Sequence, residues 1–275
     1  KQYDTSSVFN YDLKLSFGNI TDLYKVNEMK IAAEMDLSYE LTNAEIIMPT
    51  DIFVTKYENG LVDQNRNFVN IKPQYKKVSE GKFVYQVGFN FNYENDEFQD
   101  HKKVHLYPVL NGTYVINKNT GMSLLAGVGG GMKRTSLHET VNENPYLNSD
   151  VFLINENTKI SLYGGLEGKL AKYFTYNLTL AYKNFEKLSL FMNDEFDVSK
   201  FNVEYDNGNS GLFRTKGELH FSKIKKVQFG LVAQYDKYSM ANYSKAFHRP
   251  TFTGSFISKY KIKDNFHLMG DVYYL

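Results

Sequence analysis

The sequence lacks several features on which many globular proteins depend. It has no cysteine among 275 residues, so it forms neither a disulfide nor a thiolate metal site, which fits an envelope location. No apolar run approaches the roughly 20 residues that a membrane-spanning helix needs. No charge sign dominates, since 32 lysines and arginines nearly balance 31 aspartates and glutamates. That balance excludes a nucleic-acid binder that acts through bulk positive charge.

The sequence is instead rich in aromatic residues, which are placed in a regular alternation. There are 22 tyrosines and 21 phenylalanines. From Phe83 to Tyr93 every second residue is large and apolar, and most residues between them are polar or small. A β-strand points successive side chains to opposite faces, so this segment has one apolar and one polar face. The pattern recurs about a dozen times in segments of roughly ten residues, which is typical of a transmembrane β-barrel.

The alternation predicts about 13 wall strands, and Leu188–Met192 is interpreted as a short strand or as the extension of a strand into a loop. The predicted ranges are Val8–Phe17, Met29–Leu41, Ile46–Tyr57, Phe68–Lys77, Lys82–Glu94, Val104–Ile116, Met122–Lys133, Ile160–Leu170, Tyr173–Lys183, Leu188–Met192, Leu212–Ser222, Val227–Asp236, Phe252–Ile262 and Phe266–Leu275.

Short and long connections alternate along the chain. Long polar connections are predicted at Thr135–Thr158, Phe185–Gly211 and Lys237–Pro250, and a shorter one at Asn95–Lys103. Short periplasmic turns and long extracellular loops are typical of outer-membrane barrels, whose strand number is usually even. We therefore expect an all-β fold: one transmembrane, antiparallel, up-and-down barrel domain over residues 1–275, incomplete at one or both ends, with 14 or more strands when complete. Tight turns are predicted at Thr42–Glu45, Ser79–Gly81, Asn117–Gly121, Ala171–Lys172, Lys223–Lys226 and Lys263–Asn265.

The polar faces of the strands predict the lining of the lumen, because the apolar face of a membrane barrel points outward to lipid. The charges on the first two strands have mixed sign. They either cross-link the wall through cross-strand pairs or line a polar pore, and both interpretations stay open. The predicted lining residues are Lys14, Lys30, Glu34, Asp36, Glu40, Gln86, Asn90, His105, Tyr107, Lys216, Glu218 and His220.

The glycine run Gly127–Gly131 resembles a phosphate-binding loop, but such a loop needs a helix behind it and this run lies within a predicted strand. Gly127, Gly129 and Gly131 are expected to face the lumen, forming a smooth groove against which Tyr107 or Tyr163 lies.

No other motif carries chemistry. The six histidines have no metal-site spacing, since no helix is expected, and no serine lies in a nucleophile elbow. An outer-membrane protease would place paired Asp and His residues at the extracellular rim. Asp236 and His248 are the candidates for such a pair, but any other loop residue could equally lie at the rim. We therefore expect no enzymatic activity, no catalytic or metal-binding residue and no cofactor.

Four segments together resemble a known group of proteins. They are Tyr107–Leu110, Asn142–Leu147, Phe201–Asp206 and Ala246–Phe252. The combination is similar to outer-membrane barrels of Bacteroidota, especially flavobacteria, that are often described as TonB-dependent receptors. The likeness runs from about Asn65 to Leu275. It implies an energy-coupled uptake barrel with an N-terminal plug, and low-GC flavobacterial sources fit the high lysine, asparagine and tyrosine content.

Two functions follow as expectations. The first is a non-enzymatic pore or receptor-like barrel of the bacterial outer membrane, with a polar lumen and long extracellular loops. The alternative is a structural subunit of a multi-protein outer-membrane machine for barrel assembly, lipoprotein export or secretion. In both, the lipid bilayer is the first partner, other outer-membrane proteins or lipoproteins are further candidates, and nucleic acid is not a partner.

Overall fold

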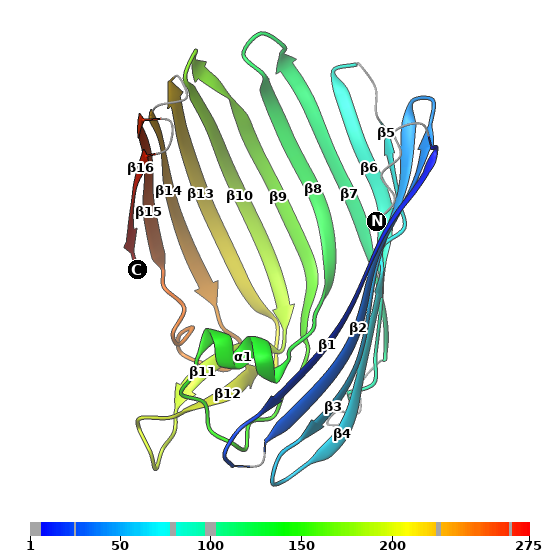
Figure 1. The fold of residues 1–275 in the computed structure, drawn as a ribbon, viewed down its shortest axis with the longest axis vertical. Coiled ribbons are helices and arrows are strands. Elements are labelled where there is room, and N and C mark those ends of the chain that lie inside the picture. Colours follow the sequence, from blue (N-terminus) through cyan, green and yellow to red (C-terminus); the bar gives the residue numbers. More distant parts are fainter. Residues whose placement is uncertain (1–6, 25, 78–80, 97–102, 224–226, 264–265) are drawn as a thin grey trace.

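A computed structural model describes residues 7–24, 26–77, 81–96, 103–223, 227–263 and 266–275. They form one strongly curved antiparallel sheet of 14 strands, whose edges are β1 and β16 (Figure 1). Neighbours in the sheet follow the order of the chain with two exceptions: β4 and β5 both pair with β3 and β6, and β11 and β12 form a separate hairpin between β10 and β13. The all-β prediction, with about 13 wall strands, is confirmed. The wall strands are β1 (Phe9–Thr21), β2 (Asn27–Leu41), β3 (Ala44–Glu58), β4 (Asp63–Ile71), β5 (Gln74–Lys77), β6 (Phe83–Glu94), β7 (Val104–Asn117), β8 (Met122–Lys133), β9 (Glu156–Ala171), β10 (Phe174–Glu186), β13 (Ser210–Lys223), β14 (Val227–Ser239), β15 (Phe252–Lys263) and β16 (Phe266–Tyr274).

The alternation in the sequence becomes two chemically different faces of the sheet. Large apolar side chains stand exposed on the convex face, with Leu15 at 72% and Phe17 at 69% exposure. A water-soluble sheet buries such a row in its core, whereas a membrane barrel turns it to lipid. The opposite face of each strand, which carries most of the polar residues, forms the concave side of the sheet.

The long connections share one end of the sheet with the short connections β1–β2 and β3–β4, and the opposite end carries tight turns (Figure 1). The short-turn end includes residues 42–43, 118–121 and 172–173, as the sequence predicts. The long connections after β8, β10 and β14 all lie at the other end. The predicted turns at 79–81, 223–226 and 263–265, and the connection at 95–103, contain residues outside the described part of the chain.

The predicted single strand Phe68–Lys77 is wrong. The chain forms β4 and β5 there, separated at Lys72 and Pro73. Proline has no N–H for the ladder, and the carbonyl oxygen of Pro73 instead accepts from the N–H of Phe89 at 3.3 Å. Both short strands still pair with β3 and β6, so the wall stays continuous across the break.

Two further elements lie within the long connections. A seven-residue helix, α1 (Leu137–Glu143), follows β8, although no helix is expected from the sequence. The hairpin of β11 (Leu188–Asn193) and β12 (Phe201–Asp206) lies in the connection after β10. Its first strand corresponds to the predicted short strand Leu188–Met192, and its second strand is absent from the predicted ranges. In the described part of the chain no helix is long and apolar enough to cross a membrane.

Candidate functional site

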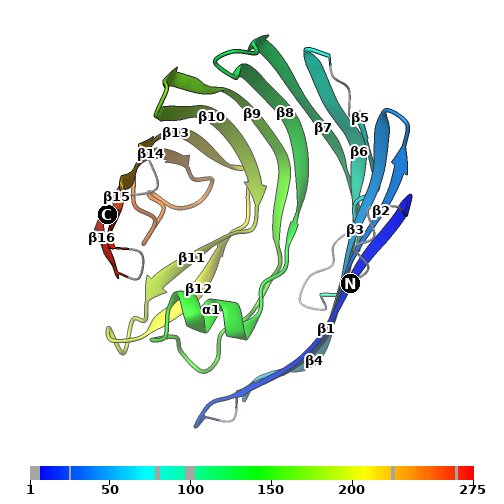
Figure 2. The ribbon, with the colours of Figure 1, turned by 45° about the horizontal axis from the view of Figure 1, so that its top comes forward.

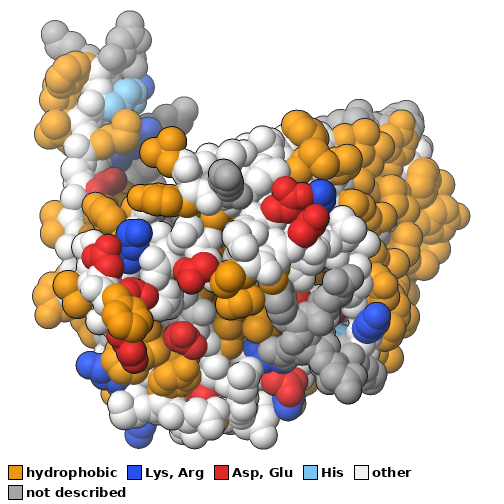
Figure 3. Space-filling model, turned by 90° about the horizontal axis from the view of Figure 1, so that it is seen from below, with side chains coloured by type: hydrophobic (Ala, Val, Ile, Leu, Met, Phe, Trp, Pro, Cys, Tyr) orange, Lys and Arg blue, Asp and Glu red, His pale blue; other side chains and the backbone are white. Residues whose placement is uncertain are grey.

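Three long connections fold together on the concave side of the sheet, at the end opposite the short turns (Figure 2). We refer to residues 134–155, 187–209 and 240–251 as the cap. The cap holds α1, the β11–β12 hairpin and the loop after β14. Viewed from this end, charged side chains are spread over the cap, while hydrophobic side chains gather along the outer side of the wall (Figure 3).

A small hydrophobic core joins the cap to the wall. Leu153 and Tyr57 are completely buried, and they belong to one cluster with residues of α1 and the hairpin. Tyr57, on β3, also donates its hydroxyl hydrogen to the carbonyl of Val151 at 2.7 Å. The cap is thus a packed structure and not a set of free loops. The buried members of the cluster are Val26, Tyr57, Leu137, Val151, Leu153, Val203 and Tyr205.

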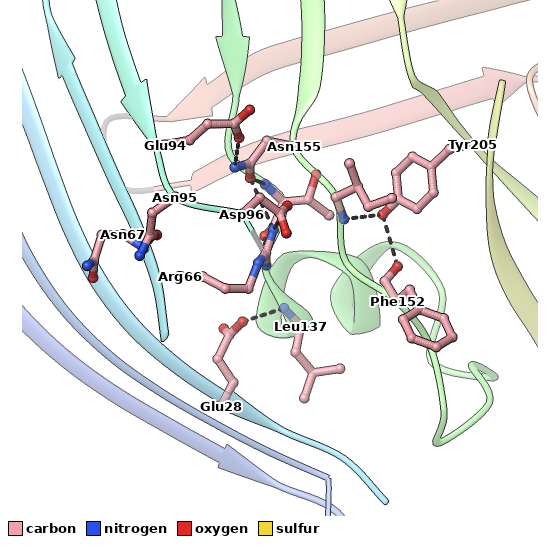
Figure 4. A network of polar contacts seen from close by, with 12 residues as sticks. Glu28, Arg66, Asn67, Glu94, Asn95, Asp96, Leu137, Phe152, Asn155 and Tyr205 are labelled. Carbon is pink, nitrogen blue, oxygen red and sulfur yellow. Dashed lines mark hydrogen bonds and ion pairs between the residues drawn. The ribbon is translucent and has the colours of Figure 1, made fainter. Parts of the chain in front are cut away.

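A buried polar network surrounds Arg66 of β4 (Figure 4). Arg66 donates to the carbonyl of Thr135 at 2.8 Å and lies 3.3 Å from the carboxylate of Asp96. The side chains of both partners of this ion pair are almost completely buried, at 6% and 1% exposure. Asn155 of the cap accepts from Arg66 and donates to the buried carboxylate of Glu94. A buried charge is tolerated only when it is paired and hydrogen-bonded, so these contacts fix the position of the cap.

The start of α1 is held by a second wall carboxylate. Glu28 of β2, which is 2% exposed, accepts from the backbone N–H of Leu137 at 2.8 Å. The N-cap residue Ser136 accepts from the N–H of Glu139 at 3.2 Å. The first N–H groups of a helix have no partner inside the helix, so Glu28 and Ser136 supply partners to donors that would otherwise be unsatisfied. The pattern Ser136–Glu139 is the sequence signature of a capping box.

The hairpin is fixed to the β8–β9 connection through Tyr205. Its hydroxyl accepts from the N–H of Ile154 at 2.8 Å and donates to the carbonyl of Phe152 at 3.2 Å (Figure 4). Burial raises the pKa of Tyr205 far above its ordinary value. The side chain therefore stays a neutral hydroxyl that both donates and accepts.

Asp206 joins the third part of the cap to the hairpin. Its carboxylate is fully buried and accepts from Ser210, from the N–H of Ala241 at 2.8 Å and from the N–H of Asn242 at 2.9 Å. Burial alone raises the pKa of this carboxyl, but the hydrogen bonds outweigh burial and the pKa lies below its ordinary value. Asp206 is therefore ionised at neutral pH and holds the β14–β15 connection in place.

The strand register puts the twelve predicted lining residues on the same face of the sheet as Glu28, which contacts the cap. They fall into separate groups along the wall. On β1 and β2, Lys14 and Glu34 form an ion pair at 2.8 Å, which is the cross-strand pairing that we considered. On β13, Glu218 contacts both Lys216 at 2.5 Å and His220 at 3.5 Å. Three further lining residues lie on β2, at increasing distance from the cap: Lys30, Asp36 and Glu40.

On β6 and β7, Asn90, His105 and Tyr107 lie toward the cap end of the strands, and Gln86 lies toward the short-turn end. His105 stacks on Tyr107, with ring centroids 6.2 Å apart, and its Nε2 lies 3.9 Å from the carboxylate of Glu94. Tyr107 also donates to Asn157 at 2.7 Å. Asn90 donates to the carbonyl of Gly130 at 3.1 Å, while Gln86 is hydrogen-bonded to Gln74.

The glycine run has the expected use, with one correction of register. Gly127 lies against the ring of Tyr163, as predicted. The residue against Tyr107 is Gly130, where an added Cβ would lie 2.6 Å from Cδ1 of that ring. An irregularity between Gly129 and Gly131 shifts the ladder with β9, so strict alternation fails at this point.

Asp236 and His248 do not form a catalytic pair. Both carboxylate oxygens of Asp236 accept from Arg214 at 2.7 Å, in a bidentate pair across β13 and β14. His248 packs edge-on against Phe201, with ring centroids 5.0 Å apart. Among the described residues, no group of three or more acidic, histidine or cysteine side chains has the geometry to hold a metal ion.

Sequence reasoning missed the residues that anchor the cap: Glu28, Arg66, Glu94, Asn155 and Asp206. These polar groups are buried because long connections fold back against the wall. The alternation of residues along a strand does not predict such contacts. One local signal was available, the capping box at Ser136 and Glu139, which predicts the start of a helix.

The sequence matches no protein-family model and no curated protein. The fold, however, is similar to solved receptors and transporters. The siderophore receptor PirA from Pseudomonas aeruginosa superposes with a TM-score of 0.64 at 10% identity, over 96% of this chain and 50% of that one. The FrpB iron transporter from Neisseria meningitidis gives 0.61 at 8% identity, over 90% and 42%. The copper transporter OprC gives 0.58 at 10% identity, over 87% and 43%.

The chain thus spans half or less of the length of these structures. Identity near 10% establishes the fold and not the ligand. The chain therefore has the β-barrel fold of outer-membrane receptors, and its apolar convex face suits contact with a bilayer.

Proposed function

We propose that residues 1–275 form one domain, the wall of a non-enzymatic outer-membrane barrel of the receptor or pore type. The polar concave face lines a passage for a polar solute, and the cap covers the extracellular mouth of that passage. The observation that carries this proposal is the coincidence of three features: an apolar convex face, a polar concave face, and long connections folded together at one end.

The arrangement supports recognition at the cap more than a wide open pore. Barrels much wider than eight strands leave an interior that side chains alone do not fill. Here the cap extends over one end of that interior and is anchored by buried polar contacts. A solute that enters from outside must pass the cap, so its polar groups are the first that the solute meets. The similar structures are described as receptors and transporters for siderophores, iron and copper, and a metal chelate is one polar solute of suitable class.

The absence of cysteine permits a direct test of location and orientation. Phe196→Cys places a thiol at the hairpin tip, where the side chain is 97% exposed. Asn119→Cys is the matched variant in the exposed short turn after β7. We expect a membrane-impermeant maleimide to label Phe196→Cys on intact cells, and Asn119→Cys only after the outer membrane is permeabilised. Equal labelling of both on intact cells, or the reverse pattern, would reject the proposed orientation.

The second candidate, a structural subunit of an envelope machine, is favoured by the apolar tip of the hairpin. Phe196 and Val198 are 97% and 75% exposed, and exposed apolar groups at a loop tip suit a protein partner. A photocrosslinker at position 196 tests this candidate in cells. Crosslinking to one protein in stoichiometric yield would support a subunit role, whereas a receptor would give no such adduct.

A further inference from the structure

We propose that the convex face of β6, β7 and β8 binds an anionic phospholipid of the inner leaflet, with its acyl chain in a groove and its headgroup at lysines of the short-turn end. This inference rests on the proposed function, because it requires the convex face to lie in a bilayer with the short turns at the periplasmic interface. It adds a lipid-binding site to a surface that otherwise serves only as a general contact with hydrocarbon.

The groove is a defined feature of the convex face. It has a volume of about 610 Å³ and is lined almost entirely by apolar atoms. Its walls include Phe83, Val87, Leu110 and Leu124, whose side chains are 37–51% exposed on this face. A volume of this size is within the range of about 300–1,000 Å³ that is usual for ligand sites.

Small side chains explain why the surface is hollow here. Gly112 of β7 lies directly opposite Ala126 of β8, and Ala126 lies opposite Gly164 of β9. The three form a row across neighbouring strands where every other convex position nearby is large. The ring of Phe83 leans over Gly112, with its edge 3.4 Å from where a Cβ would lie. A flexible hydrocarbon chain fits such a groove, because it needs shape and no hydrogen-bond partner.

Positive charge marks one end of the groove. Lys77 lies on the convex face with its Nζ 5.7 Å from the centre of the Tyr85 ring, which lines the groove. Lys82 directly precedes Phe83, and Lys118 lies in the turn between β7 and β8; both are exposed. In the sequence from Gln74 to Asn92 the one acidic residue is Glu80, which lies outside the described part of the chain, and there is none from Val104 to Lys133.

The aromatic residues place this end at a membrane interface. Tyr75 and Phe83 flank Tyr85, with ring centroids 6.3 Å and 5.7 Å from it. Tyrosine gathers where hydrocarbon meets headgroups, and lysine beside it extends its ammonium group into the headgroup layer. A phosphate at this level meets several ammonium groups, while the attached chain runs along the groove toward the middle of the bilayer. Charge complementarity therefore selects an anionic headgroup over a zwitterionic one.

The test measures phospholipid that stays bound to the purified protein. The protein is extracted from outer membranes in mild detergent, exchanged against phosphatidylglycerol or phosphatidylethanolamine, and the retained lipid is counted by native mass spectrometry. We expect preferential retention of phosphatidylglycerol. The variant Lys77→Gln/Lys82→Gln/Lys118→Gln should lose that preference, by about fivefold for each lysine. Ala126→Leu fills the groove and should lower retention of both lipids.

Each variant has a matched control. Ala233→Leu adds the same atoms to the convex face at a position flanked by Gly217 and Gly254, away from the groove. Lys133→Gln/Lys237→Gln/Lys245→Gln removes the same charge from the cap end of the molecule. Both controls should retain lipid as the unaltered protein does. The lysine variant adds no bulk to the groove and keeps side chains of similar length, so it keeps the test valid if Ala126→Leu fails to fold.

Two kinds of failure are distinguishable. Equal retention of the two lipids, or unchanged retention in both the lysine and the Ala126 variants, would overturn the lipid site and leave the barrel proposal intact. A protein that is monodisperse without detergent and shows the wrong pattern of maleimide labelling would overturn the barrel proposal itself.

Discussion

At the scale of the residue, buried polar groups hold the cap in its place. Asp206 is the clearest case, since a completely buried carboxylate accepts hydrogen bonds from a hydroxyl, two backbone N–H groups and an amide. Removing the charge leaves these donors without their partner in a site that water does not reach. Hydrogen bonds to a charged group contribute about 1.5–3 kcal/mol each to stability, which is large for a surface connection.

The lowered pKa of Asp206 makes this contact dependent on pH. The folded cap binds the proton more weakly than the unfolded chain does, so the contribution of Asp206 is complete above the ordinary carboxyl pKa of about 3.9. It is lost as pH falls through the lower pKa of the folded state. We expect the N–H groups of Ala241 and Asn242 to lose hydrogen-exchange protection, after correction for intrinsic rates, as pH falls below about 4.

Asp206→Asn serves as the control for that experiment. The variant should have weaker protection at neutral pH and little further change on acidification at these two positions. Asp194 and Asp197 of the hairpin also have lowered pKa values, chiefly because backbone N–H groups and Ser199 donate to them, so the rest of the hairpin still responds to pH. Unchanged protection of Ala241 in the variant would contradict the role assigned to Asp206.

At the scale of the element, the strand break at Pro73 depends on a single glycine. Between β4 and β5, the carbonyl oxygen of Pro73 and the Cα of Gln74 lie directly against Gly88 of β6. Any Cβ at position 88 would therefore overlap these backbone atoms. Backbone cannot rotate away as a side chain can. Gly88 is thus required by a close approach of two strands and not by an unusual φ angle.

Gly88→Ala should therefore separate β5 from β6 locally and lower the yield and stability of the folded barrel. An overpacked site of this kind typically costs about 1–3 kcal/mol. The measurement is urea unfolding of the protein in detergent, followed by tyrosine fluorescence. Gly60→Ala is the matched control, because no atom lies within 4 Å of the added Cβ and the effect should be small. Equal urea midpoints of unfolding for the two variants would argue against this close approach of the Pro73 backbone to Gly88.

At the scale of the whole molecule, the curved sheet and the cap form a wall and a cover that are coupled through Arg66. This side chain contacts Asp96 and the cap residues Thr135 and Asn155 at once. Loss of one partner of a buried ion pair costs about 3–5 kcal/mol, because the other charge stays buried without compensation. That cost weakens the attachment of the cap to the wall, which Glu28 and the hydrophobic cluster also hold.

Arg66→Ala should therefore increase the mean conductance of the protein in planar bilayers several-fold, since the cap is held less firmly over the mouth of the passage. Lys14→Ala is the control, because its ion pair with Glu34 is exposed to solvent and lies away from the cap. Equal conductance of the unaltered protein and Arg66→Ala would show that the cap does not limit the passage.

The alternation of apolar and polar residues in the sequence was sufficient to predict the wall of this protein. Strand periodicity places Leu15 and Phe17 on one face and Lys14 on the other whatever the neighbours are, so the strands, their faces and the alternation of short and long connections were all predictable. Prediction failed where local periodicity is broken, at Pro73 and at the irregularity near Gly130.

The cap was decided only by tertiary structure. Glu28 and Arg66 look like ordinary polar positions of a strand, and their role depends on α1 and the hairpin, which reach them from distant parts of the chain. The physical reason is that alternation is a property of neighbouring residues, whereas the burial of a charge depends on which segments meet in space. The sequence therefore determined which face of the wall meets lipid, and tertiary packing determined what covers its mouth.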